Sequence, residues 1–505
     1  MSIISDRPFR IIIAGGGVAG LAMSHALVRA GIDHVVLEKG VVAPDWGASI
    51  SLWGNGSRLL HQIGCLQALE AEALPLKMLH VRNPAGKAFN AEPFFDMMRE
   101  RNGFDAITME RRNFLRIVHE QLPDKSHIVT GKRVVDVVDN EDGVVVKLDD
   151  GTTEEGDILI GCDGVHSTVR ELMWRNANAS IPNYINTEEK RSLVTTYNSL
   201  VGVAKTVPGL GIRDMHWVCH PYLSFLILTQ PDQTYFFVNW KLPQKMRWPT
   251  KAKWSKDEAD RAAASVAELP ISDSVVFGEL WKHKIRAHLI GLEEGIFKHW
   301  HFGRLALVGD SVHKVVTPNF ALGANCALDS SAALLNEVVS LVKSGPEGTR
   351  PSRSAISAVF ERYQESRKPR MQRAFDVSHF LTRIQSCDGP LNHFIMRVIF
   401  PLTGQAVYAD QLADLCAGAP KFNFLPMEYP NHSTVAWKDE IAGQNKGSET
   451  IQLLNKRGGK PQRYVTMELV SLLFILVLFF TLFAPGRDLT VSESTYLLGR
   501  NISAE

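Results

Sequence analysis

The apolar residues near the N-terminus follow the order strand, helix, strand that is typical of an α/β domain. Residues 9–14 form a short β-branched run, as expected of a buried parallel strand, and residues 18–30 predict a helix. A second apolar run at residues 35–37 ends in Glu38. This alternation predicts a parallel sheet covered by helices.

The turn between the first strand and the helix is rich in glycine. Gly15, Gly17 and Gly20 have the spacing that allows a tight turn, close approach to a pyrophosphate and close helix–sheet packing. The amides at the start of the helix then face the phosphates. Glu38 lies at the distance expected for the acid that binds a ribose hydroxyl, and it would repel the ribose phosphate of NADP. A dinucleotide site is predicted; the alternative is a chance glycine turn.

Two later segments indicate which dinucleotide binds. Apolar strands at residues 157–160 and 304–308 run into the segments 161–170 and Gly309-Asp310. An aspartate at the carboxyl end of a strand is well placed to bind a ribityl or ribose hydroxyl. The alternative is that Asp310 caps the following helix. Together with the glycine turn, these segments favour FAD, bound at several points by a discontinuous domain.

The same segments resemble the class A flavoprotein monooxygenases. Residues 161–170 match the second FAD/NAD(P)H motif of that family, and residues 309–313 with Pro318 match its ribityl-binding motif. The resemblance covers roughly residues 8–385. Within the family the chain is similar to fungal FAD-dependent epoxidases of meroterpenoid, diterpenoid-pyrone and indole-diterpene biosynthesis, over residues 32–39, 47–50, 109–115, 309–314 and 317–319.

The resemblance implies cofactor contacts in addition to the three glycines. They are Glu38 at the adenosine ribose, Arg112 and Ser51 near the flavin, Asp310 at the ribityl chain, Gly323 and Ala324 beneath the flavin ring, and Asp163 beside the cofactor and the approaching reductant. The alternative for Arg112 is a solvated helix charge beside Arg111.

One segment departs from the family pattern. Relatives usually carry Gly-Gln-Gly just before the alanine and asparagine beneath the flavin, whereas this chain has Ala321-Leu322-Gly323. Ala321 adds a Cβ where a glycine could have used a positive φ. This departure leaves open a catalytically weakened, membrane-bound flavoprotein.

The expected fold is α/β: a Rossmann-type FAD-binding domain with an inserted β-sheet substrate domain and a C-terminal transmembrane helix. The expected parts are the FAD-binding domain at residues 1–190 and 291–400, with an excursion into the substrate lobe near 76–108, the substrate sheet at 191–290, and a tail or linker at 401–463. Tyr197 and Tyr222, in or beside the substrate sheet, are candidates for polar catalytic assistance, or are simply sheet residues.

The C-terminus carries a long apolar run. Residues 469–484 are uncharged, and with residues 464–467 a helix would span ~30 Å, enough for a bilayer. We therefore expect a single-pass anchor at 464–485 and a short tail at 486–505; a buried core helix is the alternative. Basic residues precede the run and only Arg487 closely follows it, which predicts a cytosolic catalytic domain, in the endoplasmic reticulum membrane.

Composition removes other classes of function. The formal net charge is +1 and no basic–aromatic patch occurs, so nucleic acid is not an expected partner. The 6 cysteines are widely separated, without a Cys-x-x-Cys pair, and no histidine pair has metal spacing. The cysteines are therefore expected to be buried thiols in a reducing compartment, and no metal site is expected.

Taken with the resemblance, these features predict a monooxygenase that uses FAD, NADPH or NADH, and O₂. The expected reaction is epoxidation of the terminal alkene of a farnesyl or geranylgeranyl chain on an aromatic, pyrone or indole head. A downstream terpene cyclase is a possible consumer of the product. The alternative enzyme is an aromatic-ring hydroxylase, which would benefit from a base that activates the ring.

Overall fold

The computed structural model describes residues 7–444 except residues 46, 251–253, 316–320 and 347–348. The chain divides into two compact units, Met1–Asp439 and Glu440–Glu505. The first unit contains all three sequence motifs, and the fold below is that of this unit.

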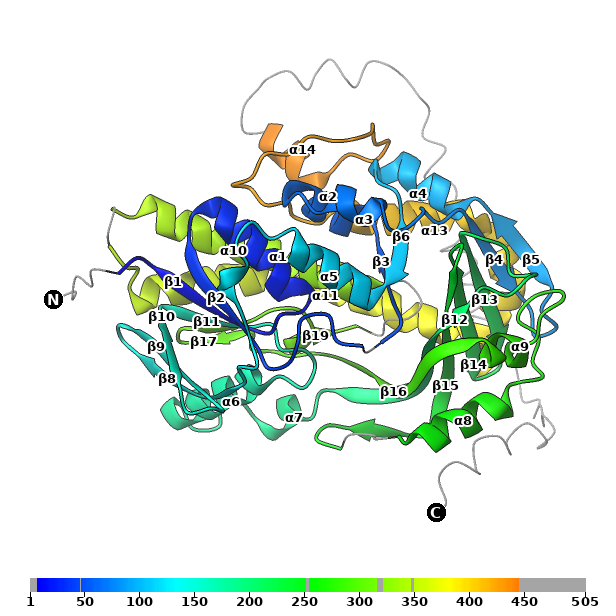
Figure 1. The fold of residues 1–505 in the computed structure, drawn as a ribbon, viewed down its shortest axis with the longest axis horizontal. Helices are drawn as coiled ribbons and strands as arrows, with labels where there is room; N and C mark the ends of the chain where they lie inside the picture. Colours follow the sequence, from blue (N-terminus) through cyan, green and yellow to red (C-terminus); the bar gives the residue numbers. More distant parts are fainter. Residues whose placement is uncertain (1–6, 46, 251–253, 316–320, 347–348, 445–505) are drawn as a thin grey trace, which may run out of the picture. The chain divides into compact units, whose positions relative to one another are not determined.

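A six-stranded sheet forms the centre of the FAD-binding part (Figure 1). Its order is β17-β18-β11-β1-β2-β7, and all neighbouring pairs are parallel except β17–β18. The strands are β1 (Arg10–Ala14), β2 (Asp33–Glu38), β7 (Ile128–Thr130), β11 (Ile158–Gly161), β17 (His301–Phe302) and β18 (Leu305–Leu307). Strand β1 lies between β2 and β11, and β18 pairs with β11 on its other side. Because these strands are parallel, the segments that follow β1, β11 and β18 all begin at the same edge of the sheet, although they are far apart in sequence.

Helices cover this sheet, and a small sheet adjoins it. Helix α1 (Val18–Ala30) follows β1 with the predicted bounds and contacts α10 (Leu322–Ser344), which also packs against α11 (Arg353–Gln385). Helices α5 (Arg111–Glu120) and α6 (Thr168–Ser180) follow β6 (Ile107–Glu110) and the second motif. Strands β8 (Val134–Asn140), β9 (Gly143–Leu148) and β10 (Thr153–Gly156) form an antiparallel three-stranded sheet.

The predicted substrate sheet is an eight-stranded mixed sheet of order β19-β16-β12-β15-β14-β13-β4-β5. Its strands are β4 (Met78–Arg82), β5 (Ala88–Glu92), β12 (Val194–Lys205), β13 (Asp214–His220), β14 (Leu223–Thr229), β15 (Gln233–Arg247), β16 (Lys284–Ile296) and β19 (His313–Lys314). β4 and β5 come from the early part of the chain, within the expected excursion, and join through the parallel β4–β13 pair. The exact domain bounds stay a prediction.

The two faces of this sheet have different neighbours. Side chains alternate along each strand, so Val218 and Phe225 pack with α8 (Lys256–Ser265) and α9 (Phe277–Lys282), whereas Met215 and Trp217 belong to the core shared with the FAD-binding part. The inner face is thereby available to form a wall of the cofactor site.

The expected linker differs from the structure over its described part. Residues 400–417 form helix α13 (Phe400–Ala417), and the chain after it packs on α2 (Gly54–Gln62). Gln62 exchanges hydrogen bonds of 2.9 Å with the backbone of Phe422, and the buried Arg58 pairs with Asp439 at 3.0 Å. The proline- and asparagine-rich composition suggested a linker, but polar groups of α2 fix this segment.

No helix among the described residues is long and apolar enough to cross a bilayer. The expected anchor at 464–485 and the tail at 486–505 lie outside the described residues.

Candidate functional site

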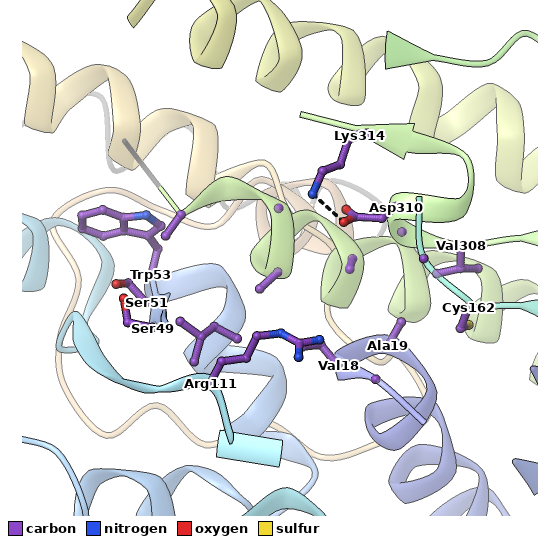
Figure 2. Close-up of a pocket in the computed structure, with 18 of the residues that line it drawn as sticks. Val18, Ala19, Ser49, Ser51, Trp53, Arg111, Cys162, Val308, Asp310 and Lys314 are labelled. Atoms are coloured by element: carbon purple, nitrogen blue, oxygen red, sulfur yellow. Dashed lines mark hydrogen bonds and ion pairs between the residues drawn. The ribbon is translucent and has the colours of Figure 1, made fainter. Parts of the chain in front are cut away.

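A cavity is lined by residues of the glycine turn and of the inner face of the substrate sheet. Figure 2 shows the lining that the glycine turn, Arg111 and Asp310 contribute. Its lining comes from the turn before α1, from β3 (Ser49–Leu52), from the second motif, from the turn η2 (Gly309–Ser311) and from the start of α10. The three motifs thus converge on one space, as the sequence predicts.

The glycines of the first turn divide into two kinds. A Cβ on Gly15, whose φ is +107°, would lie 2.5 Å from the Cys162 carbonyl oxygen, and one on Gly20 would lie 2.0 Å from the Gly15 oxygen. The protein's own packing therefore excludes a side chain at both positions. A Cβ on Gly17 would meet nothing within 4 Å, although Gly17 precedes α1 and lines the cavity. The space kept at Gly17 suits a ligand that approaches the helix N-terminus.

Glu38 lies at the carboxyl end of β2, beside this turn. Its carboxylate accepts hydrogen bonds of 2.8 Å from the amides of Gly16 and Gly40. These bonds hold Glu38 against the glycine turn. Its role at the adenosine ribose stays a prediction, with which this position agrees.

In the second motif, Asp163 has one satisfied and one unsatisfied oxygen. Its Oδ2 accepts from the Val169 amide at 3.1 Å, while the buried Oδ1 has no partner among the described residues. Burial raises the pKa of this carboxyl. Its neighbours Cys162 and Gly164 line the cavity, whereas Asp163 itself does not, so its contact with the cofactor stays a prediction.

Arg170 holds two motifs together. Its buried guanidinium donates to the carbonyl of Ser311 at 2.8 Å and to that of Val165 at 2.9 Å, and it lies 4.5 Å from the centre of the Phe297 ring. The second motif is thereby attached to the turn that carries Asp310, and Arg170 acts as a brace between them.

Charged side chains line one part of the cavity. Asp310 pairs with Lys314 at 2.6 Å, as the dashed line in Figure 2 shows, and Arg111 extends into the same space. Burial lowers the pKa of Arg111, and the attractions of Asp310 and Glu38 oppose that shift. Arg111 and Lys314 are cations of the kind that bind phosphate oxygens, so this part of the cavity suits a diphosphate.

The structure brings Arg111 to the cavity and leaves the expected Arg112 outside it. The Arg112 side chain is 51% exposed and lies 3.7 Å from Asp45. The two arginines start α5, where successive side chains point about 100° apart, so only one of them can face the cavity. The Arg-x-x-Leu motif begins at Arg112, whereas the arginine that lines the cavity is the preceding residue, Arg111.

The start of α10 forms another boundary of the cavity. Gly323 and Ala324 line it, in agreement with their predicted place beneath the flavin, and Ala321 has a φ of 48°. The Asn325 amide side chain accepts from the Trp53 backbone at 3.0 Å and donates to the Ser51 carbonyl at 3.1 Å. These bonds fix α10 beside the strand on which Ser51 also lines the cavity.

Neither tyrosine proposed for catalysis lines the cavity. The buried Tyr197 donates to Asp388 Oδ2 at 2.7 Å and lies 3.0 Å from Ser386 Oγ, which ties the sheet to the end of α11. Burial raises the pKa of its hydroxyl. Tyr222 is exposed in the turn between β13 and β14, with a φ of 60°. The structure therefore does not support polar assistance from these two side chains. Tyr197 attaches the sheet to the end of α11, and Tyr222 lies on the surface.

Strands β13, β14 and β15 of the substrate sheet contribute three apolar side chains to the described lining of the cavity: Met215, Leu228 and Phe237. The charged Lys314 comes from β19, at the edge of the same sheet. Trp53 adds an aromatic boundary, and its ring stacks on Phe95 with 5.8 Å between centroids. The site therefore has a charged part and an apolar part. Sequence reasoning predicted the substrate sheet but did not name the three side chains that line the cavity. It also missed Arg111 and Lys314, although the lysine stands only four residues after Asp310.

Comparisons with known proteins agree with this geometry. A family model described as "FAD binding domain" matches residues 9–378. The FAD-dependent monooxygenase DEP2 of Alternaria brassicicola is 40% identical over 441 residues, covering 87% of this chain and 83% of the relative. The FAD-dependent monooxygenase penE of Penicillium thymicola is 35% identical and covers 86% and 90%.

Solved structures show the same fold. Klebsiella pneumoniae HpxO complexed with FAD and uric acid aligns with a TM-score of 0.67 at 20% identity, covering 83% of this chain and 100% of that one. The tetrameric form of 2-methyl-3-hydroxypyridine-5-carboxylic acid oxygenase gives 0.57 at 20% identity, covering 80% and 96%. This chain belongs to the FAD-binding-domain family of flavoprotein monooxygenases. It is an FAD-dependent enzyme, and NAD(P)H and O₂ are the usual co-reactants of its class.

A first prediction separates the glycine that faces a ligand from those that the fold requires. Gly17→Ala will change the free energy of unfolding of the FAD-free protein by no more than about 1 kcal/mol, because the new methyl group meets no protein atom. FAD affinity will fall by roughly tenfold or more, about 1.4 kcal/mol, because the methyl group occupies the approach to the helix amides. Fluorescence titration with FAD and urea unfolding measure the two quantities. Gly20→Ala is the contrasting variant and will not accumulate as folded protein. Unchanged FAD affinity in Gly17→Ala would contradict the assignment.

A second prediction concerns the backbone before α10. Ala321→Gly will raise the free energy of unfolding by about 0.5–1 kcal/mol, because a left-handed conformation costs an alanine about 1–2 kcal/mol and glycine returns part of that gain as chain entropy. Ala43→Gly is the matched control, since Ala43 has a φ of 60° and does not line the cavity. Both variants gain stability in urea unfolding, but only Ala321→Gly alters the absorption spectrum of bound flavin. A loss of stability in Ala321→Gly would contradict this interpretation.

Proposed function

We propose that this enzyme epoxidises the terminal alkene of a farnesyl or geranylgeranyl chain attached to an aromatic, pyrone or indole head. The step would belong to fungal terpenoid secondary-metabolite biosynthesis and precede cyclisation. The main support is the apolar wall of Met215, Leu228 and Phe237, which faces the cofactor cavity from the substrate sheet. The named relatives from two fungi support the monooxygenase class.

The chemistry of an isolated alkene agrees with such a wall. Bound FAD, once reduced by NAD(P)H and exposed to O₂, supplies an electrophilic oxygen atom. An alkene is itself the nucleophile and needs no base, whereas a phenolic ring benefits from a group that accepts its proton. Among the described residues, the wall that β13, β14 and β15 form offers no such group, which favours the alkene.

The chain's own residues have the remaining tasks. Gly17 leaves room for the dinucleotide, and Arg111 with Lys314 provides positive charge beside it. The apolar wall excludes water and orients the alkene by contact alone. Trp53, supported by Phe95, limits the space that a head group or chain can occupy.

The product establishes the reaction. The purified enzyme, given NADPH, air and a geranylgeranylated aromatic acceptor, will yield a compound heavier by one oxygen atom that acid opens to a diol, as mass spectrometry before and after acid treatment shows. Tyr222→Phe is the control and will keep kcat/KM within about twofold, because its exposed hydroxyl lies outside the cavity. A ring-hydroxylated product would replace the epoxidase by the aromatic hydroxylase. Hydrogen peroxide without an oxygenated product would refute the choice of substrate.

The proposal includes a membrane anchor at residues 464–485, which would keep the enzyme near a lipophilic substrate. The support is the uncharged run 469–484 and the basic residues before it, which favour a cytosolic catalytic unit in the endoplasmic reticulum membrane.

The anchor predicts a specific behaviour in microsomes. The full chain will stay in the pellet after carbonate extraction, and a tag placed after Glu505 will resist added protease while the catalytic unit is digested. A chain that ends before residue 464 will be released by carbonate. Extraction of the full chain would refute the anchor.

A further inference from the structure

A stripe of apolar side chains lies exposed on the helical segment after α11. This segment comprises α12 (Gly389–Phe394), the π-helical turn η3 (Ile395–Ile399) and the start of α13. Leu391, Phe394, Val398 and Leu402 are exposed, by 41% for Phe394 and 77% for Leu402. The steps of three and four residues between them place the four side chains along one face of the segment. We call these four residues the apolar stripe.

The other side of the same segment is anchored in the core. Met396 and Phe400 are buried, and the Phe400 ring lies 6.4 Å from that of Trp217 in an edge-on contact. Trp217 stands on β13, two residues after Met215 in the cavity wall. The segment therefore packs firmly on the substrate sheet, and its exposed side chains are held in place by that packing.

Exposure of this kind is costly in water. Single exposed apolar residues are common on protein surfaces, but several side chains in a row mark a surface that another apolar phase covers. Helix α11, which packs against α12 and η3, also exposes Val377 and Phe380. Val377 and Phe380 on α11 thus add exposed apolar side chains on a helix that contacts the segment of the apolar stripe.

The charges of the stripe's segment are suited to lipid. From Gly389 to Ala409 the sequence contains no aspartate or glutamate, and its permanent charge is the exposed Arg397. A bilayer surface accepts a helix of this composition, because apolar side chains enter the acyl boundary while an arginine reaches the headgroups. A carboxylate in the same position would lose hydration and be repelled by anionic lipid.

We propose that the apolar stripe docks on the surface of a phospholipid bilayer and so turns the substrate sheet toward the membrane. The uncharged run at residues 469–484, outside the described residues, supports a bilayer as the occupant, because it predicts a tether that holds this unit beside lipid. The inference thus rests in part on the proposed anchor, and it adds an orientation that a tether alone does not supply. A lipophilic substrate would then leave the bilayer beside the helix that packs on β13.

The test places a fluorophore on the stripe of the full chain. Phe394→Cys and Leu402→Cys carry a nitrobenzoxadiazole label. Ile212→Cys and Ile285→Cys are the controls, because Ile212 and Ile285 are apolar residues elsewhere on the unit whose exposure, 54% and 51%, lies between those of Phe394 and Leu402. Five of the six native cysteines are buried and Cys162 is half-buried, so the chain without an added cysteine serves as the labelling blank. The labelled chains are bound to phosphatidylcholine vesicles with and without doxyl-labelled lipid.

The inference expects doxyl lipid to quench most of the fluorescence of labels at 394 and 402 and to leave labels at 212 and 285 bright. Labels at 394 and 402 that escape doxyl lipid but are quenched by aqueous iodide would overturn it, as would failure of the chain to bind vesicles. Labels at 394 and 402 that neither quencher reaches would also overturn it, because another part of the chain or a second copy would then cover the stripe. Doxyl quenching in a chain that carbonate extracts would support docking while refuting the anchor.

Discussion

The close approach of the glycine turn to the second motif is the constraint on which the cofactor site depends. Gly15 lies so near the Cys162 carbonyl that any side chain would separate β1 from β11. On the far side of β11, Ser311 Oγ donates to the Gly161 carbonyl at 2.7 Å, and Arg170 braces the same turn. Three segments that are remote in sequence are thus held together in one cradle by close backbone packing at Gly15 and by side-chain bonds to backbone carbonyls. Because little of this packing uses the ligand, the cradle can form before FAD binds.

The two faces of the substrate sheet have different roles. One face is filled by α8 and α9 and supplies stability, while Met215 and its neighbours on the other face form a wall opposite the cofactor cradle. Tyr197 shows how the wall is attached, since its hydroxyl bonds Asp388 and Ser386 at the end of α11. Tyr197, which the sequence suggested for catalysis, instead attaches the sheet to the end of α11.

Local patterns of sequence predicted local structure well. The bounds of α1 and the glycine turn before it depend on neighbouring residues, and both agree with the structure. At Ala321 the structure keeps the positive φ that a glycine could have used at this position. The choice between Arg111 and Arg112 depends on a helix rotation of one residue, which a short motif does not encode. The packing of the chain after α13 on Arg58 depends on partners hundreds of residues away. Composition alone described that segment as a linker because it is rich in proline, asparagine, glycine and lysine.

The division of the cavity into a charged and an apolar part has a chemical consequence. Arg111, Lys314 and Asp310 lie in the part that accommodates the polar cofactor, whereas Met215, Leu228 and Phe237 face it without an ionisable group. A reaction whose substrate must lose a proton before attack would be poorly served by that wall. A reaction in which a carbon–carbon double bond is the nucleophile requires only exclusion of water and correct placement. Under the proposed function, a wall without an ionisable group therefore suits an alkene better than a phenol.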